Sequence, residues 1–342
     1  MRHGGDIYRN SIRLDFSVNV NPFGIPGRVK KQLENALSYA EHYPDYDQTL
    51  LRTVIGQRHG VRSAQVLGGN GASEVLMAIM HGMTPKRILI PVPSYVGYEY
   101  VANAIGGDID FYERQSEFGL GEKFISYLET NADKTDMVIL ASPNNPTGLM
   151  ISIPTLTRIL EICEKNDIYC LLDLCFLDLT DLSDEYEEYF RSHVYPHLIR
   201  VYGFTKTFAI PGLRLGYMIA SEEIRDRIAV HIPEWNLSIF AQLAGVACLE
   251  EKQYLLESRD YIRREREWMR AEFKDLGIDS YDSAANFIFV ITEKPIFDIL
   301  FHDRILIRDC DNFRGLSKGS YRIALKKHDD NEELIRVLRD NL

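Results

Sequence analysis

The chain has 342 residues, of which 39 are basic and 50 are acidic, so its formal net charge is −11 at pH 7. This excess of acidic side chains argues against a general nucleic-acid-binding protein, whose surface must attract phosphates. Hydrophobic residues make up 45% and charged residues 26% of the chain, which is the composition of a globular protein rather than of a disordered or fibrous one.

The sequence contains no sign of a membrane span or an export signal. No apolar run approaches the ~18 residues that a spanning helix needs, and the first ten residues lack the apolar segment of a signal peptide. The five cysteines are an odd number and form no CxxC pair, which is typical of reduced thiols rather than of disulfides or a zinc site. We therefore expect a cytoplasmic protein with no metal, no membrane partner and no nucleic-acid partner.

In chain order, residues 1–30 come first and are turn-rich, with Asn21-Pro22 and Pro26-Gly27, which indicates an extended arm. The next part alternates short apolar runs, typical of buried strands, with longer segments of helical period. The runs are residues 87–91, 137–141, 168–173 and 198–202, and two of the helical segments are 73–82 and 153–166. Strands separated by helices predict an α/β domain with a mostly parallel sheet covered on both faces.

The pattern changes after about residue 230. A long, heavily charged helical stretch over residues 240–273 is followed by strand-like runs and a final amphipathic helix. The runs are residues 286–291, 304–308 and 321–325, and the helix covers 332–342. This order predicts a smaller α+β domain. We therefore divide the chain into an arm that joins the small domain (1–30), a large domain (31–235), and a connecting helix with the small C-terminal domain (236–342).

One part of the predicted small domain has an unusual charge. Residues 304–327 carry seven basic and two acidic side chains in an otherwise acidic chain. A local cationic island suits the binding of a small anion, and a solvated basic face is the alternative. Charge alone does not decide between the two.

The strongest signal is the segment GFTKTFAIPGLRLGY at residues 203–217. Lys206 follows a predicted strand, at the position where α/β sheets build sites, and Arg214 lies eight residues further on. A lysine becomes a nucleophile toward aldehydes when its ammonium group is desolvated or lies near another cation, because its pKa then falls. Taken alone, an ordinary surface lysine after a strand explains Lys206 as well.

Three further segments occupy similar positions next to predicted elements. SPNNPTG (142–148) comes after a buried strand, and Asp173 ends the next strand, where a buried carboxylate needs a partner. GGNGASE (68–74) opens a helix, so its N–H groups can hold a phosphate. A phosphate cradle, a buried acid and a lysine at neighbouring strand ends are a specific combination, although each part alone is weak.

With these motifs the sequence resembles the pyridoxal-phosphate enzymes of the class I/II aminotransferase family over nearly the whole chain. The resemblance implies the aspartate-aminotransferase fold, a large domain at 31–235 that binds pyridoxal 5'-phosphate, and a smaller C-terminal domain. It makes Lys206 the Schiff-base lysine and proton shuttle. It makes Asp173 the carboxylate that keeps the pyridinium nitrogen protonated, so that the ring can take up carbanion charge.

The same resemblance assigns further cofactor contacts. Asn145 would hydrogen-bond the ring hydroxyl, and Tyr95 would stack on the ring, unless it is an ordinary core aromatic. The residues that would hold the cofactor phosphate are Gly71, Ala72, Ser73, Thr205 and Arg214. Ser73 could instead merely start a helix.

Two more residues concern the partner subunit and the substrate. Tyr43 would reach the phosphate of the neighbouring subunit, which implies a homodimer with shared active sites, and a turn anchor is the alternative. Arg322 matches the arginine that binds the substrate α-carboxylate, for which its planar fork is suited.

The sequence departs from the family pattern at two positions. The family often has a hydroxyl residue where Gly203 stands, so one phosphate contact would be missing or replaced by water. Many aminotransferases have Tyr where Phe176 stands, and Phe176 leaves Asn145 as the main partner of the ring oxygen.

Several segments are most similar to the threonine-phosphate decarboxylases of cobalamin synthesis, which are near kin of the histidinol-phosphate aminotransferases. These segments are residues 3–5, 15–22, 173–176, 307–315 and 318–325. Both activities act on amino compounds with a phosphate ester, so a small anionic amino substrate would fit the cationic island. Candidates for its phosphate or carboxylate are His3, Asn19, Arg308 and Arg314. The alternative for the two arginines is salt bridging with Asp309 and Asp311.

The choice of reaction is geometric, because the Cα bond perpendicular to the conjugated ring is the one that breaks. Decarboxylation needs the carboxylate out of the ring plane, whereas transamination needs the Cα–H there, facing Lys206. The segment resemblance favours a decarboxylase acting on L-threonine O-3-phosphate, with an aminotransferase of the histidinol-phosphate type as the alternative. A Rossmann-like nucleotide-binding protein is a weak alternative, because the glycines lack the G-x-G-x-x-G spacing. A non-catalytic regulator with the same fold also stays open.

Overall fold

The computed structural model describes residues 4–114 and 118–342 and is built around a seven-stranded sheet with strand order β2-β8-β7-β6-β5-β3-β4. The strands are β2 (Val66–Asn70), β3 (Arg87–Val92), β4 (Asp108–Glu113), β5 (Met137–Ala141), β6 (Tyr169–Asp173), β7 (Leu198–Gly203) and β8 (Leu215–Ile219). Strand β8 runs antiparallel to β2 and β7, and the other pairings are parallel. This confirms the predicted mostly parallel sheet.

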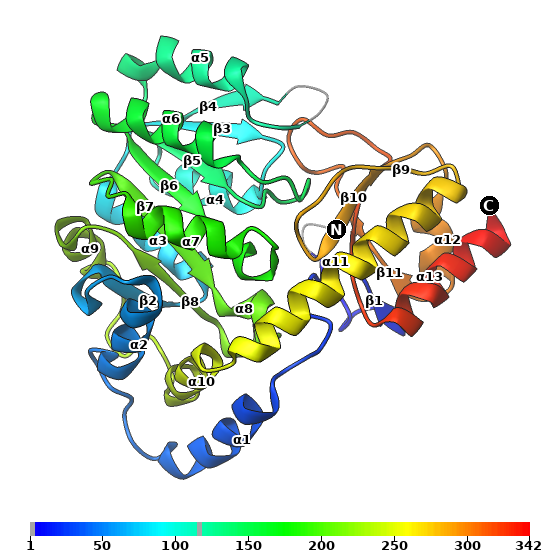
Figure 1. The fold of residues 1–342 in the computed structure, drawn as a ribbon, viewed down its shortest axis with the longest axis horizontal. Coiled ribbons are helices and arrows are strands. Elements are labelled where there is room, and N and C mark those ends of the chain that lie inside the picture. The colour runs from blue at the N-terminus through cyan, green and yellow to red at the C-terminus, as the bar shows by residue number, and fades with distance from the viewer. Residues whose placement is uncertain (1–3, 115–117) are drawn as a thin grey trace.

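Helices cover both faces of this sheet (Figure 1). One layer is formed by α3 (Ala72–Met83), α4 (Val96–Ala104) and α9 (Glu222–Ala229), and the other by α2 (Thr49–His59), α5 (Glu122–Thr130), α6 (Ile153–Lys165), α7 (Ser183–Ser192) and α10 (Ile239–Leu249). Alternate side chains of β5 therefore enter opposite cores, with Met137 and Ile139 on the first side and Val138 and Leu140 on the second. Burial on both faces explains why the strands are continuous apolar runs.

The predicted elements of this region match the structure to within one residue at each end. The four apolar runs form β3, β5, β6 and β7, and the two helical segments form α3 and α6. These predictions succeeded because a run buried on both faces has little polar content and because the helices between the strands keep one apolar side.

A second, four-stranded antiparallel sheet lies in the C-terminal part of the chain, in the order β12-β13-β10-β9. Its strands are β9 (Asp279–Ser280), β10 (Phe287–Ile291), β12 (Arg308–Asp309) and β13 (Ser320–Ala324). Figure 1 shows α11 (Lys252–Asp275) and α13 (His328–Asn341) packed beside this sheet, with α12 (Ile296–His302) next to α13. This is the smaller α+β unit predicted from the change of pattern.

Two predicted elements are divided in the structure. The run 304–308 forms β11 (Ile305–Leu306) and β12, because β11 pairs in parallel with β1 (Leu14–Asp15) of the N-terminal arm whereas β12 pairs with β13. The stretch 240–273 forms α10 and α11, and Glu251 between them has a non-helical ψ of 52°. This turn lets the apolar α10 pack against the large sheet while the charged α11 extends to the small one.

The arm ends where α1 (Gly27–Ala36) begins, and its strand β1 belongs to the C-terminal part of the fold (Figure 1). The predicted boundaries at residues 30 and 235 stay predictions. Among the residues described, no helix has the length and apolar character to cross a membrane.

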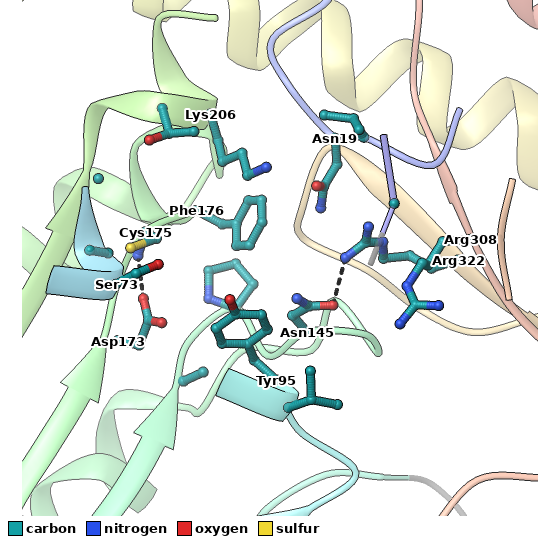
Figure 2. A pocket seen from close by; sticks show the side chains of 18 of the residues that line it. Asn19, Ser73, Tyr95, Asn145, Asp173, Cys175, Phe176, Lys206, Arg308 and Arg322 are labelled. Carbon is teal, nitrogen blue, oxygen red and sulfur yellow. Dashed lines mark hydrogen bonds between the residues drawn. The ribbon is translucent and has the colours of Figure 1, made fainter. Parts of the chain in front are cut away.

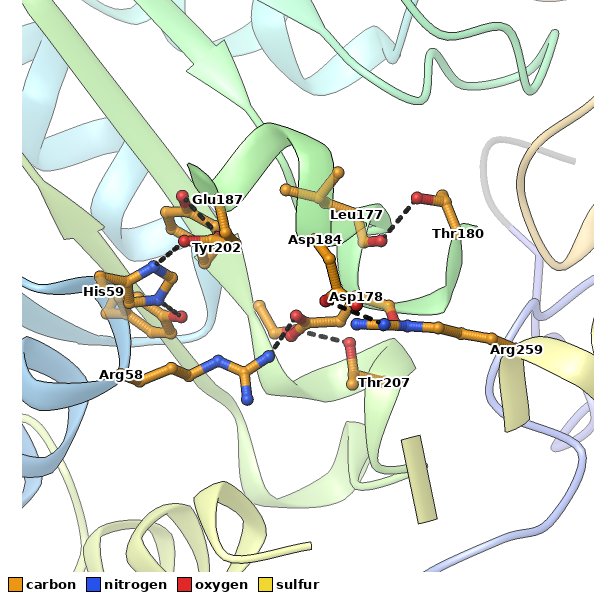
Figure 3. Close-up of polar contacts among 12 residues, drawn as sticks. Arg58, His59, Leu177, Asp178, Thr180, Asp184, Glu187, Tyr202, Thr207 and Arg259 are labelled. Carbon is orange, nitrogen blue, oxygen red and sulfur yellow. Dashed lines mark hydrogen bonds and ion pairs between the residues drawn. The ribbon is translucent and has the colours of Figure 1, made fainter. Parts of the chain in front are cut away.

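A buried polar cluster supports the ends of β7 and β8 that lead to residues 203–214 (Figure 3). His59, which is 1% exposed, contacts Glu187 Oε2 through Nδ1 at 2.7 Å and Tyr217 Oη through Nε2 at 2.8 Å. Tyr202 stacks on Tyr217 with 5.0 Å between ring centroids. Burial lowers the pKa of His59, and although burial alone would raise the pKa of Glu187, His59 and the nearby arginines lower it. A neutral imidazole therefore donates a hydrogen bond from Nδ1 to an ionised carboxylate and accepts one from the Tyr217 hydroxyl at Nε2.

We predict that His59→Phe, which keeps an aromatic ring but removes both hydrogen bonds, lowers the free energy of unfolding at pH 7.5 by about 3 kcal/mol, because the buried Glu187 carboxylate and the buried Tyr217 hydroxyl each lose a hydrogen bond. Urea denaturation of both proteins measures this difference. The pKa of His59 is lower in the folded state than in the unfolded chain, so the unfolded chain binds an extra proton as the pH falls below about 6.5. The difference between wild type and variant should therefore shrink between pH 7.5 and pH 5, and a difference that grows over this range would contradict the assignment.

Candidate active site

A cavity of about 270 Å³ lies at the C-terminal ends of β5, β6 and β7 (Figure 2). Asp173 and Lys206 reach it from the large sheet, Asn19 from the arm, and Arg308 and Arg322 from the small sheet. In α/β folds the carboxyl ends of parallel strands are where ligands bind. The cavity is thus bordered by all three parts of the chain.

Lys206 lies in the short helix α8 (Phe204–Thr207), directly after β7, and its side chain points into the cavity (Figure 2). Burial, with a smaller contribution from the Arg322 guanidinium, lowers the pKa of Lys206 to about 8. An amine with this pKa is neutral in a useful fraction of molecules near neutral pH, which is the state that attacks an aldehyde.

Asp173 ends β6 and also lines the cavity. Its Oδ1 accepts a hydrogen bond from the Cys175 backbone N–H at 2.9 Å, and its Oδ2 accepts one from the Tyr98 hydroxyl at 2.6 Å. These two bonds fix the orientation of the carboxylate. The contact of Tyr98 with Asp173 was not predicted from the sequence, because a tyrosine on a helix looks like any core aromatic. Its spacing of three residues from Tyr95 is the one signal that could have indicated it.

An anion cradle lies at the N-terminus of α3. Ala72 and Ser73 begin this helix and line the cavity together with Thr205 and Arg214. Gly71 has φ +77°, and a Cβ added to it would lie 2.5 Å from Arg214 Nη2, so the guanidinium occupies the space of the missing side chain. Free N–H groups at a helix end beside a guanidinium form a phosphate site, which fits the phosphate of the implied cofactor.

Arg322 comes from β13 and is buried at the far side of the cavity. It donates to Asn145 Oδ1 at 2.8 Å and to the Ser17 carbonyl at 2.7 Å, and in the described chain its Nε has no hydrogen-bond partner. Burial lowers its pKa to about 10. A buried guanidinium held by neutral oxygens alone is well placed for an anionic ligand group. Because Asn145 accepts with its oxygen, its amide N–H groups remain as donors.

The arm is attached to the small sheet through three successive carbonyl groups. Arg322 donates to the carbonyl of Ser17, Lys326 to that of Val18 at 3.0 Å, and Asn286 to that of Asn19 at 3.0 Å. These bonds place Ser17, Val18 and Asn19 on the cavity wall. The Asn19 side-chain amide points into the cavity (Figure 2), and its buried Nδ2 has no partner among the residues described. An amide donor in this state suits a ligand oxygen.

Two residues further on, Asn21 connects the arm to α8. Its N–H donates to the Lys206 carbonyl at 2.9 Å, and its Nδ2 donates to the Thr207 carbonyl at 3.0 Å and to Ser258 Oγ on α11 at 2.8 Å. The carbonyls at the end of a helix lack partners within it, so Asn21 caps the helix that carries Lys206. Sequence reasoning missed this role, since a polar residue before Pro22 reads as a turn.

The remaining predicted residues lie in different surroundings. Tyr95 and Asn145 line the cavity, as do Gly203 and Phe176. Arg308 lines it as well, with its guanidinium over the Phe313 ring and bonded to Asn312.

The structure does not bring two other predicted residues, Arg314 and Tyr43, to the cavity. Arg314 pairs with Glu99 at 2.8 Å and lies over Phe111, so its guanidinium is engaged away from the cavity, and its partner is neither Asp309 nor Asp311. Tyr43 is 82% exposed and packs on Trp235. His3 lies outside the described residues. No cluster of His, Cys, Asp or Glu suited to a metal ion occurs in residues 4–114 and 118–342.

The two departures from the family pattern have local explanations. A Cβ at Gly203 would lie 3.2 Å from Cys175 Sγ, so the thiol fills the space next to this glycine. Phe176 packs edge-on against Phe287 with 5.3 Å between centroids, in an apolar corner that offers no hydroxyl to the cavity.

The depressed pKa of Lys206 predicts its reactivity. In the protein without cofactor, the acetylation rate of Lys206 by acetic anhydride, followed by peptide mass spectrometry, should reach half of its maximum near pH 8. Arg322→Gln should move this midpoint upward, because it removes a cation that lowers the pKa. A midpoint near that of an ordinary lysine, about 10.4, would show that the amine is not desolvated.

The cap formed by Asn21 predicts local stability. Asn21→Ala removes the side-chain bonds to α8 and α11, each of which contributes about 1 kcal/mol, so hydrogen exchange in a peptide covering residues 203–209 should become at least about tenfold faster. Ser258→Ala is the matched control: it removes the Asn21 bond to α11 and the Ser258 bond to the Tyr254 carbonyl within α11, but leaves both Asn21 bonds to α8, so it should have a smaller effect. Equal exchange in wild type and Asn21→Ala would refute the capping role.

Comparison with known proteins agrees with this geometry. The family described as aminotransferase class I and II matches residues 11–338. The chain is 31% identical to a threonine-phosphate decarboxylase of Salmonella typhimurium over 96% of this chain and 91% of the relative. It is 28% identical to a histidinol-phosphate aminotransferase of Carboxydothermus hydrogenoformans over 86% of this chain and 82% of the relative.

Solved structures include a relative of the same shape. The crystal structure of the histidinol-phosphate aminotransferase from Clostridium acetobutylicum is 30% identical, with a TM-score of 0.89 over 96% of this chain and all of that one. This confirms the predicted fold. The chain therefore belongs to the class I and II aminotransferase family of pyridoxal-phosphate-dependent enzymes.

Proposed function

We propose that this enzyme decarboxylates a small phosphorylated amino acid, with L-threonine O-3-phosphate as the substrate, and that its product supplies the side chain of cobalamin. The observation that carries the proposal is the second cationic end of the cavity, formed by Arg322 and Arg308, across from the phosphate cradle at Arg214. A substrate with two anionic groups matches these two guanidinium groups once the cradle holds the cofactor phosphate. The cavity of about 270 Å³ has to hold cofactor and substrate together, which favours a small substrate.

Different residues of the site would hold different parts of the cofactor. Ala72, Ser73, Thr205 and Arg214 would hold its phosphate, with Gly71 leaving room for the guanidinium. Tyr95 would cover one face of its ring, Asp173 would face its nitrogen, and Asn145 would donate to its ring oxygen. Bound there, pyridoxal 5'-phosphate supplies an aldehyde for an amine and a ring that accepts the electron pair of a broken Cα bond.

This chain's own groups then decide which Cα bond breaks and where protons go. Arg322, fixed by Asn145 and Ser17, would bind one anionic group of the substrate and Arg308 with Asn19 the other, which together orient Cα. In a decarboxylation no proton leaves Cα, and the Lys206 ammonium delivers one to it after carbon dioxide departs. In a transamination the neutral Lys206 amine removes the Cα proton instead.

An aminotransferase of the histidinol-phosphate type is the second candidate. It is supported by the Clostridium acetobutylicum structure, which superposes over the whole of its length. The same residues would serve either reaction, since the two guanidinium groups would bind the substrate's anionic groups and the resulting orientation of Cα would decide which of its bonds breaks.

We also propose a cytoplasmic homodimer. Tyr43, Tyr46 and Trp235 form an exposed aromatic cluster, with ring centroids of Tyr43 and Trp235 5.1 Å apart. Covering this cluster with a second copy would remove apolar surface from water and bring Tyr43 toward the neighbouring phosphate cradle. The five cysteines are free thiols, in keeping with a reducing compartment.

One experiment decides the reaction class. The enzyme with pyridoxal 5'-phosphate is incubated either with L-threonine O-3-phosphate or with histidinol phosphate, each with and without 2-oxoglutarate, and both carbon dioxide and glutamate are measured. We expect carbon dioxide release that does not depend on the keto acid, and its loss in Lys206→Ala, which lacks the amine that returns the proton. Glutamate formation from histidinol phosphate, without carbon dioxide release from L-threonine O-3-phosphate, would instead establish the second candidate.

A further inference from the structure

Tyr98 lies next to Asp173 and lines the same cavity. It is 1% exposed on α4, and its hydroxyl donates to Asp173 Oδ2 at 2.6 Å, while Oδ1 is held by the Cys175 N–H. Each carboxylate oxygen therefore has one fixed donor and keeps its remaining acceptor capacity. The carboxylate cannot rotate without breaking one of the two bonds.

The Tyr98 hydroxyl acts as a donor to this carboxylate over the whole working range of pH. Burial, together with the negative charge of Asp173, raises the pKa of Tyr98 well above its ordinary value. The phenol thus stays protonated and remains a hydrogen-bond donor to Asp173 Oδ2. A hydrogen bond to a charged group is also the stronger kind.

The ring of Tyr98 supports a second wall of the cavity. It packs edge-on against Tyr95, with centroids 5.4 Å apart and an interplanar angle of 86°. This arrangement is favourable for aromatic pairs. One side chain therefore contacts both the carboxylate and the aromatic ring that would border the cofactor.

We propose that Tyr98 is a positioning residue for the cofactor: its hydroxyl keeps the Asp173 carboxylate aimed at the pyridine nitrogen, and its ring holds Tyr95 in place. The proposal rests on the proposed function, because it needs pyridoxal 5'-phosphate in the cavity. Removing only the hydroxyl leaves Asp173 with the Cys175 N–H as its backbone donor and free to rotate. The resulting loss of cofactor affinity should therefore depend on the presence of the pyridine nitrogen.

The test compares two ligands that differ at that nitrogen. Wild type, Tyr98→Phe and Tyr127→Phe are prepared without cofactor and titrated with pyridoxal 5'-phosphate and with its deaza analogue, in which carbon replaces the pyridine nitrogen. Tyr127 is the matched control, because its hydroxyl donates to Asp110 Oδ2 at the same 2.6 Å on the protein surface. Affinities come from absorbance and calorimetric titration.

We expect wild type to prefer pyridoxal 5'-phosphate over the deaza analogue, and Tyr98→Phe to reduce this preference about tenfold while binding the analogue as wild type does. Tyr127→Phe should keep the preference of wild type. Equal weakening of both ligands in Tyr98→Phe would assign Tyr98 a purely structural role and overturn the proposal, as would an unchanged preference. Wild type that binds neither ligand would refute the proposed function itself.

A double-mutant cycle tests whether Tyr98 acts through Asp173. Asp173→Asn removes the carboxylate through which Tyr98 acts. The preference for pyridoxal 5'-phosphate over the deaza analogue should therefore be smaller in this variant than in wild type. Adding Tyr98→Phe to Asp173→Asn should then change the preference less than twofold. A further tenfold change in the double variant would show that Tyr98 acts independently of Asp173 and would overturn the proposal.

Discussion

The burial of two cations beside one cavity is the constraint on which the site depends. Taking an ammonium and a guanidinium out of water is costly unless other groups replace the lost hydration. Here Arg322 is held by an amide oxygen and a backbone carbonyl. The pKa values of both groups fall, to about 8 for Lys206 and about 10 for Arg322. Two kinds of ligand offset the cost of burying these cations. An anion does so by pairing with Arg322, and an aldehyde does so by reacting with the neutral amine of Lys206.

The fold keeps these charges in place by joining segments that are distant in sequence. The large sheet supplies Asp173 and Lys206, the small sheet supplies Arg308 and Arg322, and the arm lies between them. Three consecutive arm carbonyls accept hydrogen bonds from the small domain, and Asn21 then caps the helix of Lys206. The arm therefore connects Arg322 to the helix of Lys206 through hydrogen bonds at Ser17 and Asn21.

Much of this architecture could be predicted from the sequence, and the exceptions have physical causes. Apolar runs buried on both faces and residues placed at strand ends are local patterns, so β3, β5, β6, β7, Asp173 and Lys206 were located correctly. The division of residues 304–308 into β11 and β12 depends on two different pairing partners, which no local pattern encodes. Arm carbonyls are backbone groups with no sequence signature. Tyr98 cannot be told from a core aromatic by sequence alone. Arg314 forms its ion pair with Glu99, which is 215 residues away in the sequence, so no local pattern predicts this pairing.

The most direct test of the account is where pyridoxal 5'-phosphate attaches. The enzyme loaded with this cofactor is reduced with borohydride, digested and mapped by mass spectrometry. The account predicts a phosphopyridoxyl group on Lys206, and its loss from that peptide in Lys206→Ala. A label on another lysine, with Lys206 unmodified, would contradict the assignment of the nucleophile and leave only the fold in place.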